Sequence, residues 1–124
     1  DGPLPVRDLV EAFLRPDFEA IDALQARGTG RARLVGQAYA QPTEHVRDLM
    51  HRQFDPVGAA FFPEFFAALP GRDVDTIRWR LRWAVVGVIV ALFGNADEPD
   101  GPIDGRAFGR TVDFVTAGLE APTN

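Results

Sequence analysis

Potential metal ligands gather in one short stretch of the chain, where His45, Asp48 and His51 follow Glu44. On a helix, His45 and His51 would lie about 120° apart around the axis and about 9 Å apart along it. Two ligands four residues apart would share a face, but these two histidines do not. The spacing therefore favours a polar helix face, and we expect no metal site.

Glu64 is the carboxylate with the most apolar sequence neighbours, since it lies within the run Phe61, Phe62, Pro63, Phe65 and Phe66. In an apolar pocket, burial would raise the pKa of this carboxyl and fit it for acid–base chemistry. A helix also allows Glu64 to face solvent while the phenylalanines turn inward, and we favour that arrangement.

Three kinds of nucleophilic catalysis are excluded by composition. The chain contains no Cys, no Ser and no Lys, so thiolate, serine and Schiff-base catalysis have no nucleophile. The sequence has no glycine-rich dinucleotide motif, no phosphate-binding loop and no nucleophile elbow. We therefore expect a protein that is not an enzyme, with no catalytic residue and no cofactor.

The basic residues are 13 arginines, of which Arg78, Arg80 and Arg82 alternate with apolar residues. A helix would place Arg78 and Arg82 on one face and Arg80 elsewhere, which favours solvated or acid-paired side chains over an anion site. The net charge of −5 argues against binding of nucleic-acid phosphates by this chain alone.

The elements that must position these residues are predicted to be helices of one domain spanning residues 1–124, because 124 residues with 46% apolar content suit a single packed core. Apolar periodicity and the positions of Pro and Gly predict helices over 6–15, 18–26, 31–40, 44–54, 57–69, 74–93 and 105–119. Pro16 is expected to end the first helix, and Pro63 to kink or restart the helix over 57–69. The expected helix caps include Asp17, Thr43, Asp73 and Asp104. No stretch reaches the ~20 apolar residues of a membrane span.

The segment 74–93 carries conflicting signals. Residues 77–83 alternate apolar and charged side chains and residues 85–90 are mostly β-branched, and both patterns are typical of strands. Its length without a turn favours a helix, apolar nearly all round, which other helices must cover on several sides.

Two sets of apolar residues could form a functional surface or site. Aromatic residues concentrate in 54–66 and 79–93, where a bundle could enclose either a hydrophobic ligand or a plain close-packed core. The last two helices expose more apolar surface than 124 residues can cover, which indicates a dimeric four-helix bundle. The residues expected at the dimer face are Val88, Leu92, Phe108, Val112, Val115 and Leu119.

Several stretches together resemble the C-terminal effector-binding and dimerisation domain of TetR-family transcriptional regulators. They are RDLMHRQFDPV at 47–57, FFPEFFAALP at 61–70, IRWRL at 77–81 leading into VVG at 85–87, and VDFV at 112–115 with AGL at 117–119. The similarity covers nearly the whole chain. The N-terminal helix-turn-helix that is diagnostic of the family has no counterpart in the sequence.

The resemblance implies an all-α, single-domain bundle that forms a homodimer, binds a small hydrophobic or acyl-type effector, and reaches DNA only through a domain absent from this chain. It implies a cytoplasmic protein with no membrane partner. The expected ligand-binding residues are Met50, Phe54, Phe62, Phe65, Trp83 and Gly87. Two alternatives stay open: a helical protein-interaction module without a pocket, and a small helical enzyme using Glu64 or a histidine as its base.

Overall fold

The computed structural model describes residues 2–26, 34, 37–38, 41, 43–94 and 106–123. Its long elements are α1 (Val6–Ala26), α3 (Glu44–Ala68), α4 (Val74–Gly94) and α5 (Ala107–Glu120). Within these ranges the structure contains helices and no strand, so the prediction of an all-α fold is confirmed. The helix expected over 31–40 falls mostly outside the described residues.

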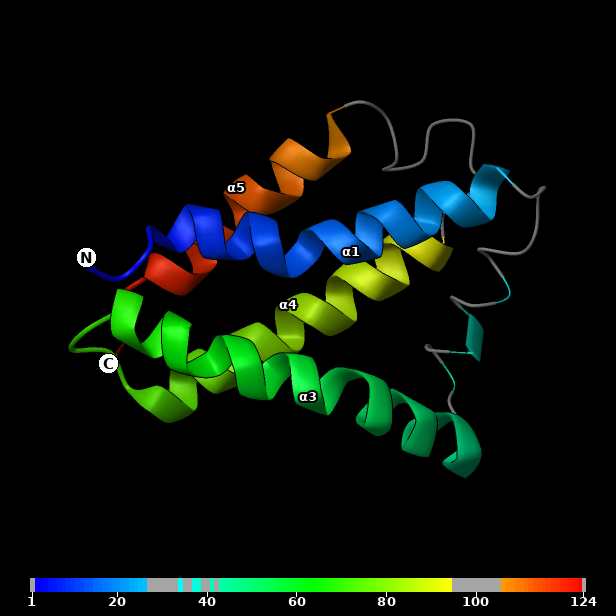
Figure 1. Ribbon diagram of the computed structural model, residues 1–124, viewed down its shortest axis with the longest axis horizontal. Coiled ribbons are helices and arrows are strands. Elements are labelled where there is room, and N and C mark those ends of the chain that lie inside the picture. Colours follow the sequence, from blue (N-terminus) through cyan, green and yellow to red (C-terminus); the bar gives the residue numbers. More distant parts are fainter. Residues whose placement is uncertain are drawn as a thin grey trace.

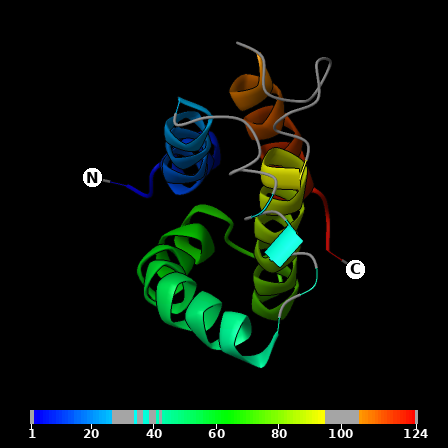
Figure 2. The same cartoon turned by 90° about the vertical axis from the view of Figure 1, so that its right-hand side faces the viewer.

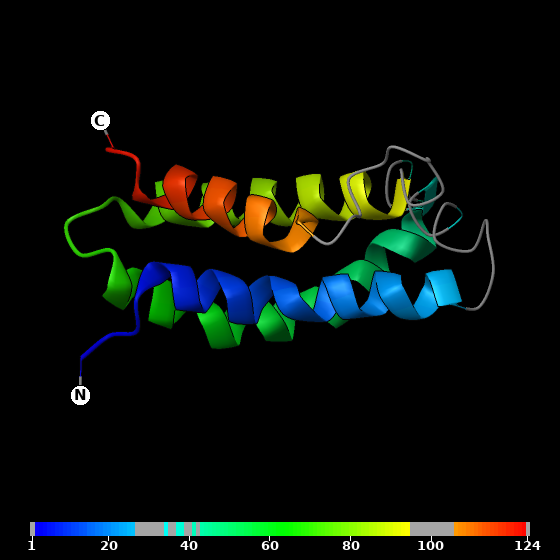
Figure 3. The ribbon, with the colours of Figure 1, turned by 90° about the horizontal axis from the view of Figure 1, so that it is seen from above.

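The helices form two layers, with α1 and α3 in one and α4 and α5 in the other (Figures 1 and 3). In the view along the bundle in Figure 2, α4 and α5 lie together on one side of the molecule, and α1 and α3 lie on the other. One side of the second layer therefore packs inward, and the other side is not covered by the described part of the chain.

Helix α1 runs without a break through Pro16, so the prediction that Pro16 ends a helix and Asp17 caps the next one is wrong. Proline removes one backbone hydrogen bond from the helix. The apolar row that begins at Val6 continues through Leu14, Phe18 and Ile21, all buried, and this burial offsets the lost bond.

Helix α3 likewise continues through Pro56 and Pro63, where two separate helices were predicted. Its predicted start is confirmed, because the Thr43 hydroxyl accepts a hydrogen bond from the backbone N–H of Val46 at 3.3 Å. After α3, the chain turns at Gly71, whose φ of 81° lies in the left-handed region that glycine adopts without strain.

Helix α4 forms despite the strand-like pattern of its sequence, and the helix prediction is confirmed. The predicted cap at Asp73 is also present, since its Oδ2 accepts from the Thr76 backbone N–H at 2.9 Å and the Thr76 hydroxyl at 2.7 Å. These hydrogen bonds lower the pKa of Asp73. The cap expected at Asp104 lies outside the described residues.

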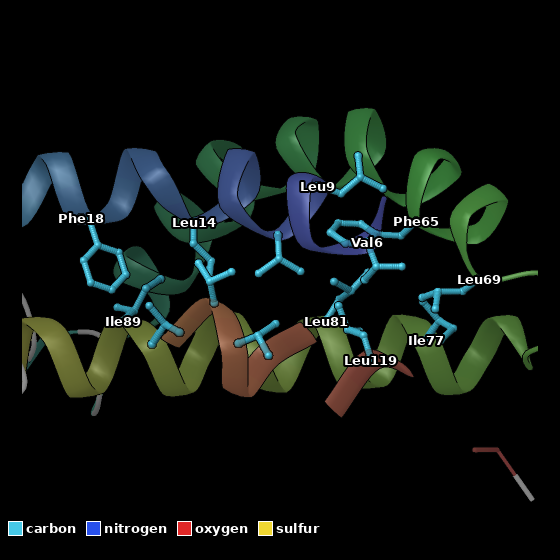
Figure 4. Close-up of a cluster of buried hydrophobic side chains, with 14 of the residues drawn as sticks. Val6, Leu9, Leu14, Phe18, Phe65, Leu69, Ile77, Leu81, Ile89 and Leu119 are labelled. Carbon is cyan, nitrogen blue, oxygen red and sulfur yellow. The ribbon is translucent and has the colours of Figure 1, made fainter. Parts of the chain in front are cut away.

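The core lies between the two layers and draws on all four helices (Figure 4). Its members are fully or nearly fully buried apolar side chains, with no buried polar residue among the described ones. They are Val6, Leu9, Val10, Leu14, Phe18, Ile21, Phe65, Leu69, Ile77, Leu81, Val88, Ile89, Ala107, Val112, Val115 and Leu119. Within the described residues, no helix is both long and apolar enough to cross a membrane.

Candidate functional site

A small apolar cavity of about 10 Å³ lies where all four helices meet. Its lining contains no polar side chain: Val10, Phe13, Leu14, Phe65, Leu81, Ala84, Val85 and Val115. A cavity of this size has room for about one water molecule at most, whereas pockets for drug-sized ligands occupy about 300–1,000 Å³. In this conformation the core is closed, and a ligand of that size requires the helices to move apart.

Aromatic rings form the wall of this region between α1 and α3. Phe13 lies 5.1 Å from Phe61 and 5.7 Å from Phe65, measured between ring centroids, in tilted pairs of the kind that stabilise protein interiors. Phe65 is fully buried and points into the core between the layers (Figure 4). The predicted aromatic cluster therefore forms in part, from rings of α3 together with Phe13 of α1, whereas Trp79 and Trp83 are exposed and do not join it.

The predicted ligand-binding residues do not all converge on the cavity. Phe65 lines the cavity, but Phe62 does not. The ring of Phe62 packs against Gly58 and against the ring of Phe66, with the two ring centroids 6.2 Å apart. Trp83 and Gly87 are exposed on the far side of α4. The side chains of Met50 and Phe54 lie outside the described residues.

Sequence reasoning missed most of the lining, namely Val10, Phe13, Leu14, Leu81, Ala84, Val85 and Val115. A signal for the first three exists in the apolar periodicity of residues 6–14. That periodicity identifies an inward face, but it does not tell which inward residues border a cavity.

The outer face of α4 and α5 carries the largest exposed apolar side chains of the second layer. We define this outer face by Trp79 and Trp83, each 59% exposed, Val86 at 45% and Phe114 at 81%. The centroids of the two tryptophan rings lie 5.5 Å apart. At about 100° per residue, Trp79, Trp83 and Val86 form one row, opposite the buried row of α4.

The predicted dimer seam lies inside the chain. Val88, Val112, Val115 and Leu119 are all buried within a single molecule. Phe108 is half-buried against Phe18, with ring centroids 5.1 Å apart, and its ring also faces the guanidinium of Arg15. The side chain of Leu92 lies outside the described residues. The four buried residues leave no surface for a second chain, and the largest exposed apolar side chains of α4 and α5 are instead those of the outer face.

Two glycines lie beside the outer face at positions where the chain has room for a larger side chain. A Cβ atom added at Gly87 or Gly118 would meet nothing within 4 Å. Glycine in a helix interior costs about 1 kcal/mol relative to alanine. No contact within the described chain offsets that cost at either position.

The polar candidates are dispersed over the surface. Glu64 is exposed, which confirms that it faces solvent. His45 and His51 are also exposed, and the described residues contain no group of three or more potential metal ligands.

The three arginines of α4 have separate surroundings. The Nη1 atom of Arg78 lies 3.4 Å from Oδ1 of Asp75, and its guanidinium lies over the ring of Phe66. Arg80 donates to the backbone carbonyl of Ala121, directly after α5. Arg82 is exposed. They do not form an anion site.

Asp17 is a half-buried carboxylate inside α1. Burial raises the pKa of Asp17 from 3.8 to about 6, and its carboxylate has no hydrogen bond or ion pair among the described residues. Sequence reasoning assigned Asp17 to a helix cap and therefore missed it. In the structure it lies inside α1, one turn beyond the cavity-lining residue Phe13.

Comparison with known proteins identifies the family of the chain. No curated protein and no solved structure was found to match it. The family described as "Tetracyclin repressor-like, C-terminal domain" matches residues 11–118, which include most of α1 and α5 and all of α3 and α4. With a match over that length and an all-helical fold, the chain belongs to the family of tetracyclin repressor-like C-terminal domains.

Proposed function

We propose that this chain is the effector-binding and dimerisation domain of a TetR-type transcriptional regulator, forming one domain over residues 1–124. It senses a small hydrophobic ligand and controls DNA binding by a helix-turn-helix domain outside this chain. A regulator of this kind is expected in the cytoplasm. The observation that carries the proposal is the uncovered apolar outer face beside a core lined only by apolar side chains.

The homodimer forms through the outer face of α4 and α5 in this proposal. Two copies related by a twofold axis would bring four helices together, and the same residues of each copy would meet. Trp79, Trp83 and Phe114 supply large apolar area, and aromatic residues of this kind dominate the energetics of protein interfaces. Gly87 and Gly118 would allow a partner helix to approach closely, which accounts for glycine at two otherwise unconstrained positions.

The effector would bind by enlarging the cavity between the layers. A ligand that fits only a more open arrangement stabilises that arrangement by its difference in affinity, typically about 1–3 kcal/mol. Helix α1 is well placed to transmit the change, because it lines the cavity through Phe13 and is joined to α5 by the ion pair between Arg7 and Asp113. A shift of α1 relative to α5 would alter the spacing of the two DNA-binding domains in the dimer.

A second candidate function is a helical interaction module that binds no small molecule. The closed core favours it, since a cavity of about 10 Å³ does not admit an effector without rearrangement. The same outer face would then serve dimerisation or another protein partner. An enzyme is not favoured, because Glu64, His45 and His51 are all exposed and none borders the cavity.

A ligand screen by thermal shift separates these functions. The proposal predicts that at least one class of apolar small molecule raises Tm in a saturable manner, because a ligand that binds only the folded state stabilises it. Ala84→Leu fills part of the cavity and should abolish the shift, whereas Ala67→Leu on the exposed side of α3 should preserve it. A panel without any saturable shift would favour the interaction module. Equal shifts in both variants would show that the ligand binds outside this cavity and would overturn the proposed site.

A further inference from the structure

Asp17 occupies the middle of the apolar face of α1. At about 100° per residue, it lies about 20° from Val10 and Leu24 and about 40° from Phe13 and Ile21 around the helix axis. Val10 and Ile21 are fully or nearly fully buried, and Phe13 and Leu24 pack against the core. A carboxylate therefore interrupts a row that is otherwise apolar.

The position of Asp17 relates it directly to the proposed ligand site. Val10 and Phe13 both line the cavity, and Asp17 follows Phe13 by one helical turn, about 6 Å along the axis. Phe13 also contacts Phe61 and Phe65, so this row of α1 faces α3. A ligand that extends from the cavity toward the C-terminal half of α1 would reach the Asp17 carboxylate.

No group in the described structure compensates the charge of Asp17. The carboxylate is half-buried, and it forms no hydrogen bond or ion pair with any described residue. Placing a charge in apolar surroundings without a partner is costly, and proteins rarely retain such a group without a reason. The raised pKa of Asp17 results from burial alone, which agrees with the absence of a nearby cation among the described residues.

We propose that the effector carries a protonated amine on an apolar body, and that Asp17 binds this amine while the apolar body lies among the rings of Phe13 and Phe65. This inference rests on the proposed effector-binding function and specifies the class of effector. A charge-assisted hydrogen bond between ammonium and carboxylate is stronger than a neutral one, and low exposure strengthens it further. Repulsion between like charges should weaken the binding of an acyl effector with a free carboxylate.

Three probes that differ only in the head group test the proposal: 4-phenylbutylamine, 4-phenylbutan-1-ol and 4-phenylbutanoate. Binding of each to the 124-residue chain would be measured by calorimetry at pH 7.5. We expect the amine to bind at least about tenfold more tightly than the alcohol, and the carboxylate to bind most weakly. Asp17→Asn should reduce amine affinity about tenfold or more and leave the alcohol unchanged.

Asp22→Asn is the matched control, because it removes the same charge from an exposed position of α1 and should leave amine binding unaltered. A carboxyl NMR titration of the wild-type chain gives an independent readout. The amine should lower the pKa of Asp17 on saturation, and the alcohol should not.

The two proposals fail in different ways. If the alcohol and the amine bind equally well, and Asp17→Asn changes neither, then the Asp17 inference is overturned while the effector-binding function stands. If the carboxylate binds most tightly, the inference is overturned as well. Absence of binding by all three probes contradicts both proposals.

Discussion

The guanidinium of Arg80 fixes the end of α5 against α4, with its Nη1 donating to the carbonyl oxygen of Ala121 at 2.6 Å. Its Nη2 donates to the carbonyl of Pro122 at 3.0 Å, and Arg72 donates from Nη2 to the carbonyl of Glu120 at 2.6 Å. The last carbonyl groups of a helix lack intrahelical partners and carry partial negative charge. Arg72 therefore satisfies one such group, at Glu120, while Arg80 binds carbonyl groups of the segment that follows α5. Together they hold the end of α5 beside α4.

Replacement of Arg80 by alanine should lower the free energy of unfolding by about 1–3 kcal/mol, because the hydrogen bonds from its charged guanidinium to the carbonyl groups of Ala121 and Pro122 are lost. Urea unfolding followed by circular dichroism measures this change. Arg82→Ala, at an exposed position of the same helix, should change it by less than about 0.5 kcal/mol. Equal midpoints for the two variants would show that the contacts of Arg80 do not stabilise the fold.

Substitution of Phe114 by aspartate should convert the proposed dimer into a folded monomer. The side chain is 81% exposed in the single chain, so the change disturbs little internal packing but introduces a charge into the proposed interface. Light scattering coupled to size exclusion measures the mass. Leu49→Asp, which changes an exposed apolar residue of α3, should remain dimeric. If Phe114→Asp also remains dimeric, the outer face is not the interface.

Substitution of Val112 by aspartate should instead unfold the chain. Val112 is fully buried between the layers, and an unpaired carboxylate there costs several kcal/mol, a large part of the stability of a small domain. Far-ultraviolet circular dichroism should show the loss of helix at about room temperature. A well-folded Val112→Asp monomer would place this residue at the interface, as the sequence pattern indicated.

Asp17 should make stability depend on pH in a direction opposite to that of most carboxylates. Its pKa in the folded chain, about 6, lies above the ordinary value of 3.8, so the folded state binds the proton more tightly than the unfolded state. The stability contributed by protonated Asp17 is complete below about pH 4 and is lost as pH rises through 6.

Asp17→Asn removes this contribution from the pH dependence. The variant should therefore gain stability relative to wild type between pH 4 and pH 7, by up to about 3 kcal/mol, because a tenfold difference in proton affinity between the folded and unfolded states corresponds to about 1.4 kcal/mol. Urea midpoints at pH 4, 5, 6 and 7 measure the difference. A difference that does not change with pH would contradict the burial of this carboxylate.

The helical class and several boundaries could be predicted because they depend on local signals. Thr43 and Asp73 form the predicted helix caps, and the length of 74–94 correctly outweighed its strand-like pattern. The helices expected to end at Pro16 and to start again at Pro56 are instead continuous through these residues. Continuous burial along α1 offsets the cost of Pro16, and that burial is a property of the assembled bundle rather than of the local sequence.

The site was less predictable because a periodic apolar face does not specify which element covers it. Val112 and Leu119 form a regular seam that the sequence assigned to a second chain, but helices of the same chain cover it. Trp83 was expected in the pocket because of its aromatic character, yet it lies on the outer face. Asp17 carried two competing signals, a preceding proline and an apolar row, and the proline led to the wrong interpretation.

The mass of the unmodified chain in solution tests the central claim most directly, because dimerisation through the outer face underlies the proposed regulatory role. Light scattering over a range of concentrations should give twice the chain mass of 13.6 kDa, with dissociation only on strong dilution. A mass of 13.6 kDa at the highest concentration would contradict the account.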